Sequence, residues 1–151
     1  MPTKLRSARP EDFDYCATLY FGGMEKTIPE LNLSMPTQVD TFRQRWEGTE
    51  VRIITLDGID IGWLQSSTQD ASLFLAQLFV DPAFQRQGFG TEVMNGLIQE
   101  ATVAGQDVTL GVVKTNPARR LYERLGFRVT HEDDRKVYMR REPGSEVPNL
   151  S

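Results

Sequence analysis

The chain has 151 residues, of which 39% are hydrophobic and 25% are charged, and this composition predicts one soluble globular domain. A formal net charge of −4 argues against nucleic acid as an obligate partner, because phosphate binding needs a basic face. No apolar run reaches membrane-spanning length, so we expect no membrane partner either.

The cysteine and histidine counts restrict the chemistry further. Cys16 is the single cysteine, which excludes an internal disulfide and is typical of a reducing compartment. The N-terminus lacks the apolar core of a signal peptide, and we therefore expect a cytoplasmic protein. One cysteine and one histidine predict no zinc site. Cys16 falls on a predicted apolar helix face, so we interpret it as a buried side chain.

Hydrophobic periodicity, glycines and prolines predict alternating helices and strands. In chain order these are a strand at 4–6, a helix at 9–23, a loop or broken helix at 24–35, a helix at 36–47, strands at 51–56 and 59–64, a polar loop at 65–70, a strand at 73–80, a helix after Gly88 that ends at Gly105, a strand at 108–113, a helix at 116–126, and strands at 127–130 and 136–140 around a charged turn.

Individual residues support several of these elements. Asp57 and Gly58 form the favoured two-residue hairpin turn. Val39, Phe42 and Trp46 recur at helical spacing and predict one buried stripe. Residues 73–80 are apolar on both faces, which favours a central position in the sheet.

The element order predicts an α/β fold, a three-layer sandwich with a mixed central sheet of about seven strands. No repeat or linker interrupts it, so residues 1–141 are interpreted as a single domain. Residues 142–151 contain two prolines and few apolar residues, and they predict a flexible C-terminal tail.

The most informative stretch follows the central strand. After Asp81, a short loop leads through Gly88 and Gly90 into a helix. Glycine lets a backbone approach a ligand closely, and a helix start offers unpaired N–H groups, so this pattern favours an anion, most often phosphate. Arg86 adds a positive charge nearby.

Three phosphate-binding patterns compete for this stretch. A P-loop requires Gly-Lys-Ser/Thr, and no lysine follows Gly88. A dinucleotide fingerprint requires a third glycine where Val93 stands, and an acidic residue where the next strand leads into Lys114. The stretch resembles instead the acetyl-CoA site of the GNAT superfamily of N-acetyltransferases, whose signature Gln/Arg-x-x-Gly-x-Gly/Ala matches Gln85, Gly88 and Gly90. A glycine-lined helix entry without a ligand is the simpler alternative.

A second stretch is similar to another signature of this family, an Asn followed by Ala, Tyr and Gly-Phe. The matching residues are Asn116, Ala118, Tyr122 and Gly126–Phe127. Because two signatures occur in the right order, the chain is identified as a member of the GNAT superfamily, with the strongest match over residues 73–138. The resemblance implies the acyl-CoA N-acyltransferase fold, with acetyl-CoA as the acyl donor.

The resemblance also implies how the donor is held. Backbone N–H groups of the loop would bind the diphosphate, and the strand end would pair with the pantetheine arm and stabilise the carbonyl oxygen. The implied cofactor-binding residues are Leu78, Phe79, Val80, Gln85, Arg86, Gln87, Gly88, Phe89, Gly90, Thr91, Asn116 and Tyr122.

Two residues are candidates for the proton transfers. Tyr122 is the candidate general acid, because a phenol of pKa about 10 is protonated at neutral pH and can donate to a thiolate. On periodicity alone Tyr122 is better explained by core packing, and the family match reverses this preference in favour of the catalytic role. For the base, the strand offers only Gln77, so Glu25 is the candidate, with Glu30 and ordered water as alternatives.

These residues together predict an N-acetyltransferase that moves acetyl from acetyl-CoA directly to a primary amine of a small molecule, peptide or protein. A non-catalytic acyl-CoA-binding or sensing module on the same fold is the alternative, and a partner-binding domain with a vestigial loop is a third.

Trp46 and Trp63 are better explained by core packing than by an acceptor pocket. His131 is expected to be an exposed side chain in the charged turn. Many family members dimerise, so a homodimer is compatible with the resemblance.

Overall fold

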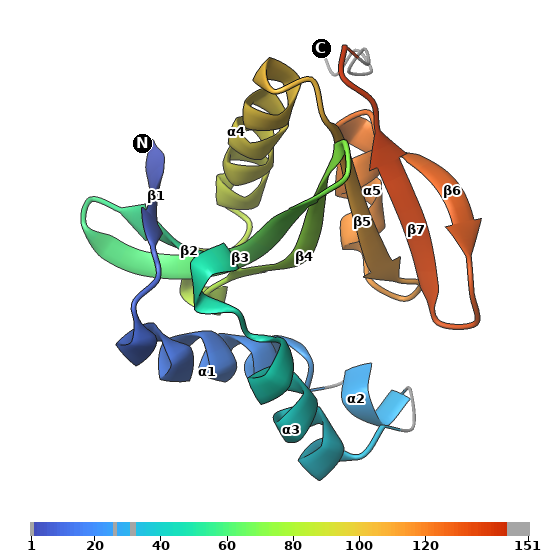
Figure 1. Cartoon of the computed structure of the whole chain (residues 1–151). Coiled ribbons are helices and arrows are strands. Elements are labelled where there is room, and N and C mark those ends of the chain that lie inside the picture. Colours follow the sequence, from blue (N-terminus) through green and yellow to red (C-terminus); the bar gives the residue numbers. More distant parts are fainter. Residues whose placement is uncertain (1, 26, 31–32, 145–151) are drawn as a thin grey trace. The chain divides into compact units, whose positions relative to one another are not determined.

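The computed structural model of the chain describes residues 2–25, 27–30 and 33–144 (Figure 1). Its strands are β1 (Thr3–Ser7), β2 (Val51–Leu56), β3 (Ile59–Gln69), β4 (Ser72–Val80), β5 (Asp107–Val113), β6 (Arg128–Glu132) and β7 (Lys136–Arg141). Its α-helices are α1 (Phe13–Gly23), α2 (Thr27–Glu30), α3 (Met35–Arg45), α4 (Phe89–Val103) and α5 (Ala118–Arg124). Short 3-10 turns stand at Pro10–Asp12, Gly48–Glu50 and Pro82–Phe84.

The strands form one seven-stranded sheet in the order β1-β2-β3-β4-β5-β7-β6. The pairing of β4 with β5 is parallel, whereas β1 with β2, β2 with β3, β5 with β7 and β6 with β7 are antiparallel. The predicted mixed sheet of about seven strands is therefore confirmed. The strand that is apolar on both faces, β4, occupies the middle of the order as predicted.

The chain divides into two compact units, one of residues 1–65 with 77–89 and one of residues 66–76 with 90–151. The first holds α1, α3, β1, β2 and most of β3. The second holds β5, β6, β7, α5 and nearly all of α4. Strand β4 contributes its first half to the second unit and its second half to the first.

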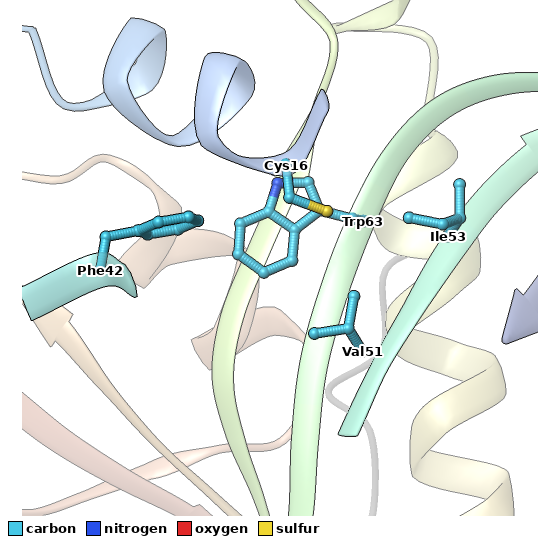
Figure 2. Close-up of a cluster of buried hydrophobic side chains, with 5 residues drawn as sticks. All are labelled: Cys16, Phe42, Val51, Ile53 and Trp63. Carbon is cyan, nitrogen blue, oxygen red and sulfur yellow. The ribbon is translucent and has the colours of Figure 1, made fainter. Parts of the chain in front are cut away.

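The core of the first unit is a cluster of buried apolar side chains from α1, α3, β2 and β3. Figure 2 shows its members, which are Cys16, Phe42, Val51, Ile53 and Trp63. Cys16 and Trp63 have no exposed surface, which confirms their predicted packing roles. The rings of Phe42 and Trp63 meet edge to face at 6.0 Å. Helices α1 and α3 therefore share their hydrophobic core with β2 and β3.

The second unit pairs β4 with β5 over Ser72–Leu75 and Asp107–Leu110, and β5 continues into a six-residue pairing with β7. The residues that helix α4 buries recur at helical spacing and are Val93, Met94, Leu97, Ile98 and Ala101. Arg141 is itself buried, and its Nε donates to the carbonyl oxygen of Leu125 at 2.8 Å. This bond satisfies an acceptor at the C-terminus of α5, where helix carbonyls lack partners.

Several sequence predictions need correction. Residues 65–69 belong to β3 rather than to a loop, and the turn comes at Asp70, whose φ is 55°. Gln65 is polar, so its position was predicted to be in a loop. In the structure Gln65 is buried within the strand, because its Nε2 donates to Arg45 O and to a carboxylate oxygen of Glu50. Val39 is 39% exposed and does not belong to the buried stripe.

The remaining outcomes concern turns and the tail. Asp57 and Gly58 have φ of 51° and 82°, which confirms the predicted hairpin turn. His131 is exposed as predicted, but it lies within β6 rather than in the turn. Of the predicted tail, residues 145–151 lie outside the described part of the chain. Among the described helices, none has the length and apolarity to cross a bilayer.

Candidate functional site

The loop between β4 and α4 is held at its start by Asp81. The Asp81 N–H donates to Ile61 O of β3 at 2.7 Å, and its carboxylate accepts the N–H of Ala83 at 2.9 Å. The latter bond caps the 3-10 turn Pro82–Phe84. The Asp-Pro pair thus ends the strand and fixes the direction in which the loop leaves it.

Gln85 ties the loop back to the end of the strand. Its Nε2 donates to Val80 O at 2.8 Å. This gives the first residue of the recognised signature a structural function that the sequence alone did not reveal. Residues 85–88 are all exposed.

The backbone of the loop twice enters the left-handed region. Arg86 has φ of 64° and Gly88 has φ of 83°. For arginine this region is disfavoured by about 1–2 kcal/mol, so the conformation of Arg86 is imposed by the loop. Successive N–H groups in alternating right- and left-handed conformations converge on one side of the chain and form an anion-binding concavity.

Helix α4 begins immediately after this loop, at Phe89. The first N–H groups of an α-helix have no intrahelical acceptor, and the helix dipole adds a partial positive charge there. In this helix those donors include the N–H groups of Phe89, Gly90 and Thr91. Arg86 is exposed and contributes a full positive charge from the preceding loop. The donor set fits a diphosphate.

Gly90 is not required by the fold. Its backbone is helical, and a Cβ added to it would meet nothing within 4 Å. Glycine in a helix is disfavoured against alanine by up to about 1 kcal/mol, so its presence calls for another explanation. An open surface over Gly90 is consistent with close approach of a ligand. Gly88 differs, since its positive φ alone accounts for glycine.

The second half of β4 provides the other predicted contact. The parallel ladder with β5 covers Ser72–Leu75, and β4 continues beyond it to Val80. Leu78, Phe79 and Val80 are all half-buried. The carbonyl oxygen of Phe79 lies so close to Gly62 of β3 that a Cβ at Gly62 would clash with it. Gly62 therefore sets the close approach of β3 to this part of β4.

The side chain of Phe79 belongs to an aromatic group that sequence reasoning missed. Its ring stacks on Trp63 with centroids 5.6 Å apart and an interplanar angle of 25°. It also contacts Tyr20 of α1 at 5.5 Å between centroids. Tyr20, Trp63 and Phe79 come from three different elements, so no local pattern in the sequence indicates that their rings meet.

Tyr122 is buried in α5, with 9% of its surface exposed. Its ring meets Phe127 edge to face at 5.8 Å. Desolvation by burial raises the pKa of the Tyr122 phenol above its ordinary value of 10.0. The neutral form, which can donate a proton, is therefore present throughout the physiological range.

Asn116 and Glu25 are both exposed. The Asn116 side-chain oxygen accepts the N–H of Ala118 at 2.9 Å, and α5 begins at Ala118, one residue later than its sequence indicated. Asn116 therefore satisfies one of the N–H groups at the start of α5, which have no acceptor within the helix. Glu25 lies in the turn that follows α1, as expected for a loop carboxylate. The side chain of Glu30, the alternative base, lies outside the described atoms.

Residues 47–129, more than half of the chain, match the family described as "Acetyltransferase (GNAT) domain". The chain belongs to this GNAT family. The matched range includes the loop at 85–91 and Tyr122. Membership supports acetyl transfer as the general activity of the chain.

The GNAT chain also has similar proteins of known identity. Over 70 residues, 46% of this chain, it is 37% identical to the cysteine-rich protein 2-binding protein of Homo sapiens. The match spans only 9% of that human protein.

Two solved structures resemble the GNAT chain along nearly its whole length. The PaiA N-acetyltransferase of Thermoplasma acidophilum, solved in complex with coenzyme A, has a TM-score of 0.76 at 15% identity and covers 94% of this chain and 99% of that one. The ribosomal-protein-S18-alanine N-acetyltransferase of Escherichia coli has a TM-score of 0.66 at 21% identity, with 99% of both chains covered. At these identities the likeness shows a shared fold.

Proposed function

We propose that this GNAT chain transfers the acetyl group of acetyl-CoA directly to a primary amine. The observation that carries the proposal is the loop before α4, where two left-handed residues, Arg86 and Gly88, lead directly into a helix start. This backbone presents several N–H donors to one anion. Membership in the GNAT family makes the diphosphate of coenzyme A the anion that this loop best fits.

The loop residues would bind the donor through their main chain. We assign the N–H groups of Gln87, Gly88, Phe89, Gly90 and Thr91 to the diphosphate oxygens. Arg86 supplies a positive charge to the same group. Such binding depends on backbone conformation and on open space over Gly90, and it tolerates variation of the other side chains.

The end of β4 would hold the rest of the donor. Strand β4 continues from Leu75, the last residue of its ladder with β5, to Val80, and we assign the peptide groups of Leu78–Val80 to the amides of the pantetheine arm. One N–H of this segment would donate to the thioester carbonyl oxygen, where negative charge develops in the transition state. A donor fixed in a strand needs no reorganisation during the reaction.

Tyr122 would hold the proton that the leaving sulfur takes when the carbon–sulfur bond breaks. Its buried phenol stays neutral at physiological pH because desolvation raises its pKa. The position of Tyr122 in the second family signature, six residues after Asn116, supports this assignment. Asn116 keeps the start of α5 in place through its bond to Ala118.

The amine must lose its proton before it attacks the thioester carbonyl. We keep Glu25 as the proposed acceptor of that proton, either directly or through water. An α-amine of pKa near 8 needs little help at neutral pH, whereas a lysine amine of pKa about 10.4 needs more. The single cysteine, buried Cys16, fits the reducing cytoplasm that we propose as the compartment.

A thiol-release assay with acetyl-CoA and a panel of primary amines tests the proposal. We expect turnover on at least one amine, with one N-acetylated product for each thiol released. Donor binding without turnover on any amine would instead support the non-catalytic acyl-CoA-binding module. Absence of donor binding in calorimetry would contradict both.

A further inference from the structure

We propose that Arg141 is a positioning residue for Tyr122, because its hydrogen bond to Leu125 O fixes the end of α5 and with it the direction of the Tyr122 phenol. The inference rests on the proposed acetyl transfer, in which Tyr122 supplies the proton to the leaving sulfur. Arg141 lies outside both family signatures and beyond residues 47–129, which match the GNAT family. Arg141 and α5 belong to the same compact unit.

Arg141 breaks the apolar pattern on the inner face of β7. Val137, Met139 and Arg141 alternate along the strand and are all buried, but only the first two are apolar. Burial of a guanidinium costs free energy unless its N–H groups find acceptors, so packing alone favours a third apolar residue here. The arginine is therefore explained by the groups to which it donates.

The acceptor that Arg141 Nε reaches is the carbonyl oxygen of Leu125, at 2.8 Å and buried from solvent. Leu125 is the C-terminal cap of α5, where carbonyl oxygens lack donors within the helix and the helix dipole adds partial negative charge. A cationic donor suits this position. Because β7 is held to β5 by a continuous ladder, the bond attaches the end of α5 to a fixed part of the sheet.

The turn that contains Leu125 is bonded directly to Tyr122. The carbonyl oxygen of Tyr122 accepts the N–H of Leu125 and the N–H of Phe127, each at 3.0 Å. The rings of Tyr122 and Phe127 meet edge to face at 5.8 Å. Residues 122–127 therefore form one closed unit, and Arg141 holds that unit to β7.

The direction of the Tyr122 phenol depends on this unit. Within the described part of the chain no hydrogen bond reaches the Tyr122 hydroxyl, and desolvation is the cause of its raised pKa. The ring therefore points where the backbone of α5 and the contact with Phe127 direct it. A misplacement of about 1 Å can cost a catalytic group about 10²-fold in rate, so the anchorage of α5 bears directly on turnover.

Two substitutions separate the hydrogen bond from general packing. Arg141→Gln places an N–H donor where Nε stands, since both nitrogens are bonded to Cδ, whereas Arg141→Met places a methyl group there. We expect Arg141→Met to speed amide hydrogen exchange at Leu125 and Phe127 about tenfold or more, and Arg141→Gln to stay within about threefold of the wild type. The amides of Val112 and Val137, which pair farther along the ladder, should exchange alike in all three proteins. Unchanged exchange at Leu125 and Phe127 in Arg141→Met would overturn the inference.

Steady-state kinetics test the coupling to Tyr122, with acetyl-CoA and the primary amine of highest turnover in the thiol-release panel. We expect Arg141→Met to lower kcat about tenfold or more while acetyl-CoA affinity stays within about threefold, and Arg141→Gln to restore kcat. In a Tyr122→Phe background, Arg141→Met should lower kcat by less than about threefold, because no phenol remains to be placed. An equal fold loss in both backgrounds would overturn the inference, since Arg141 would then act on the fold alone.

Arg140→Met is the matched control for these measurements. Arg140 is the preceding residue of β7, is exposed, and pairs with Asp107 at 3.3 Å, so its loss should change kcat by less than about threefold. Should Arg141→Met not fold, Arg141→Lys takes its place with the same expected losses, because it keeps the charge but has a methylene where Nε stands. Failure of the wild-type chain on every amine would overturn the proposed function, whereas turnover with equal losses in both backgrounds would overturn this inference alone.

Discussion

Gln85 Nε2 donates a hydrogen bond of 2.8 Å to the carbonyl oxygen of Val80. The bond joins the middle of the loop before α4 to the last residue of β4. These are the two segments to which we assign the diphosphate and the pantetheine arm. Gln85 therefore fixes the loop relative to the strand end, and both residues that the signature allows at this position, Gln and Arg, have a side chain that can donate.

Replacement of Gln85 tests this hydrogen bond. We expect Gln85→Ala to weaken acetyl-CoA binding about tenfold, the equivalent of one net hydrogen bond of about 1–1.5 kcal/mol. Gln85→Arg retains a donor and should keep affinity within about threefold. Calorimetric titration of the three proteins measures this directly. Equal affinity of the alanine variant and the wild type would show that the bond does not organise the site.

Tyr122→Phe tests the general acid. It removes the phenol and keeps the ring against Phe127, so we expect kcat to fall by about 10²-fold or more with little change in donor affinity. A loss below about tenfold would remove Tyr122 from this role.

The pH profile adds an independent check on Tyr122. The functional form is the protonated phenol, which is present below the folded-state pKa and lost as pH rises through it. Because burial raises that pKa above 10.0, kcat should not fall between pH 7 and pH 10. An alkaline fall below pH 10 that disappears in Tyr122→Phe would contradict the raised pKa of the Tyr122 phenol, because it would show that the phenol loses its proton below its ordinary value.

Glu25→Gln tests the proposed proton acceptor. An exposed carboxylate that acts as a base contributes about 10²-fold or more to the rate, so the variant should lose that much kcat/KM near pH 7. The loss should shrink as pH rises toward the pKa of the amine, because the neutral amine then needs no acceptor. If kcat/KM changes by less than about threefold at pH 7, water takes the proton instead. Asp14→Asn, which removes another exposed carboxylate, in the first turn of α1, is the control.

The Arg6–Asp12 ion pair predicts how the free energy of unfolding depends on pH in the acid range. Arg6 donates to both carboxylate oxygens of buried Asp12 at 2.9 and 3.0 Å and to Asp60 at 3.0 Å. The hydrogen bond from Arg6 holds the pKa of Asp12 below its ordinary value of 3.8. A depressed carboxylate pKa contributes stability that is present above the unfolded-state pKa and lost as pH falls through the folded-state value.

We therefore expect Arg6→Met to destabilise the chain by about 1–3 kcal/mol at pH 7 in urea unfolding. The difference from the wild type should shrink below pH 3.8, where protonation removes the Asp12 charge. Arg128→Met breaks an exposed pair with Glu142 and should change stability by less than about 1 kcal/mol at either pH. A difference that is constant from pH 7 to pH 3 would contradict the linkage.

Much of the fold was predictable because local chemistry and the tertiary structure agree. Asp57 and Gly58 adopt the left-handed conformations that their sequence indicates, and the apolar run in β4 occupies the middle of the sheet. The failure at residues 65–69 has a physical cause. Gln65 is polar yet buried in β3, because partners far along the chain satisfy it. Such partners leave no local pattern in the sequence.

In the candidate site, too, the features set by adjacent residues were predictable and those set by distant residues were not. The glycines and the helix start were readable from the sequence, since each depends on a few adjacent residues. The left-handed φ of Arg86 was not, because arginine does not favour it and the loop imposes it. The aromatic group around Phe79 was also missed, since Tyr20, Trp63 and Phe79 come from three elements far apart in sequence.

The most direct test of the central claim is the acetyl-CoA affinity of Gly90→Val against Gly96→Val, measured by calorimetry. Both glycines lie in α4, both have open space where a Cβ would stand, and neither has a positive φ, so the two substitutions should affect folding alike. If the start of α4 binds the diphosphate, Gly90→Val loses about 100-fold or more in affinity while Gly96→Val matches the wild type, a difference of about 2.7 kcal/mol or more. Equal affinities would contradict the account, because donor binding would then not depend on close approach to the backbone at Gly90.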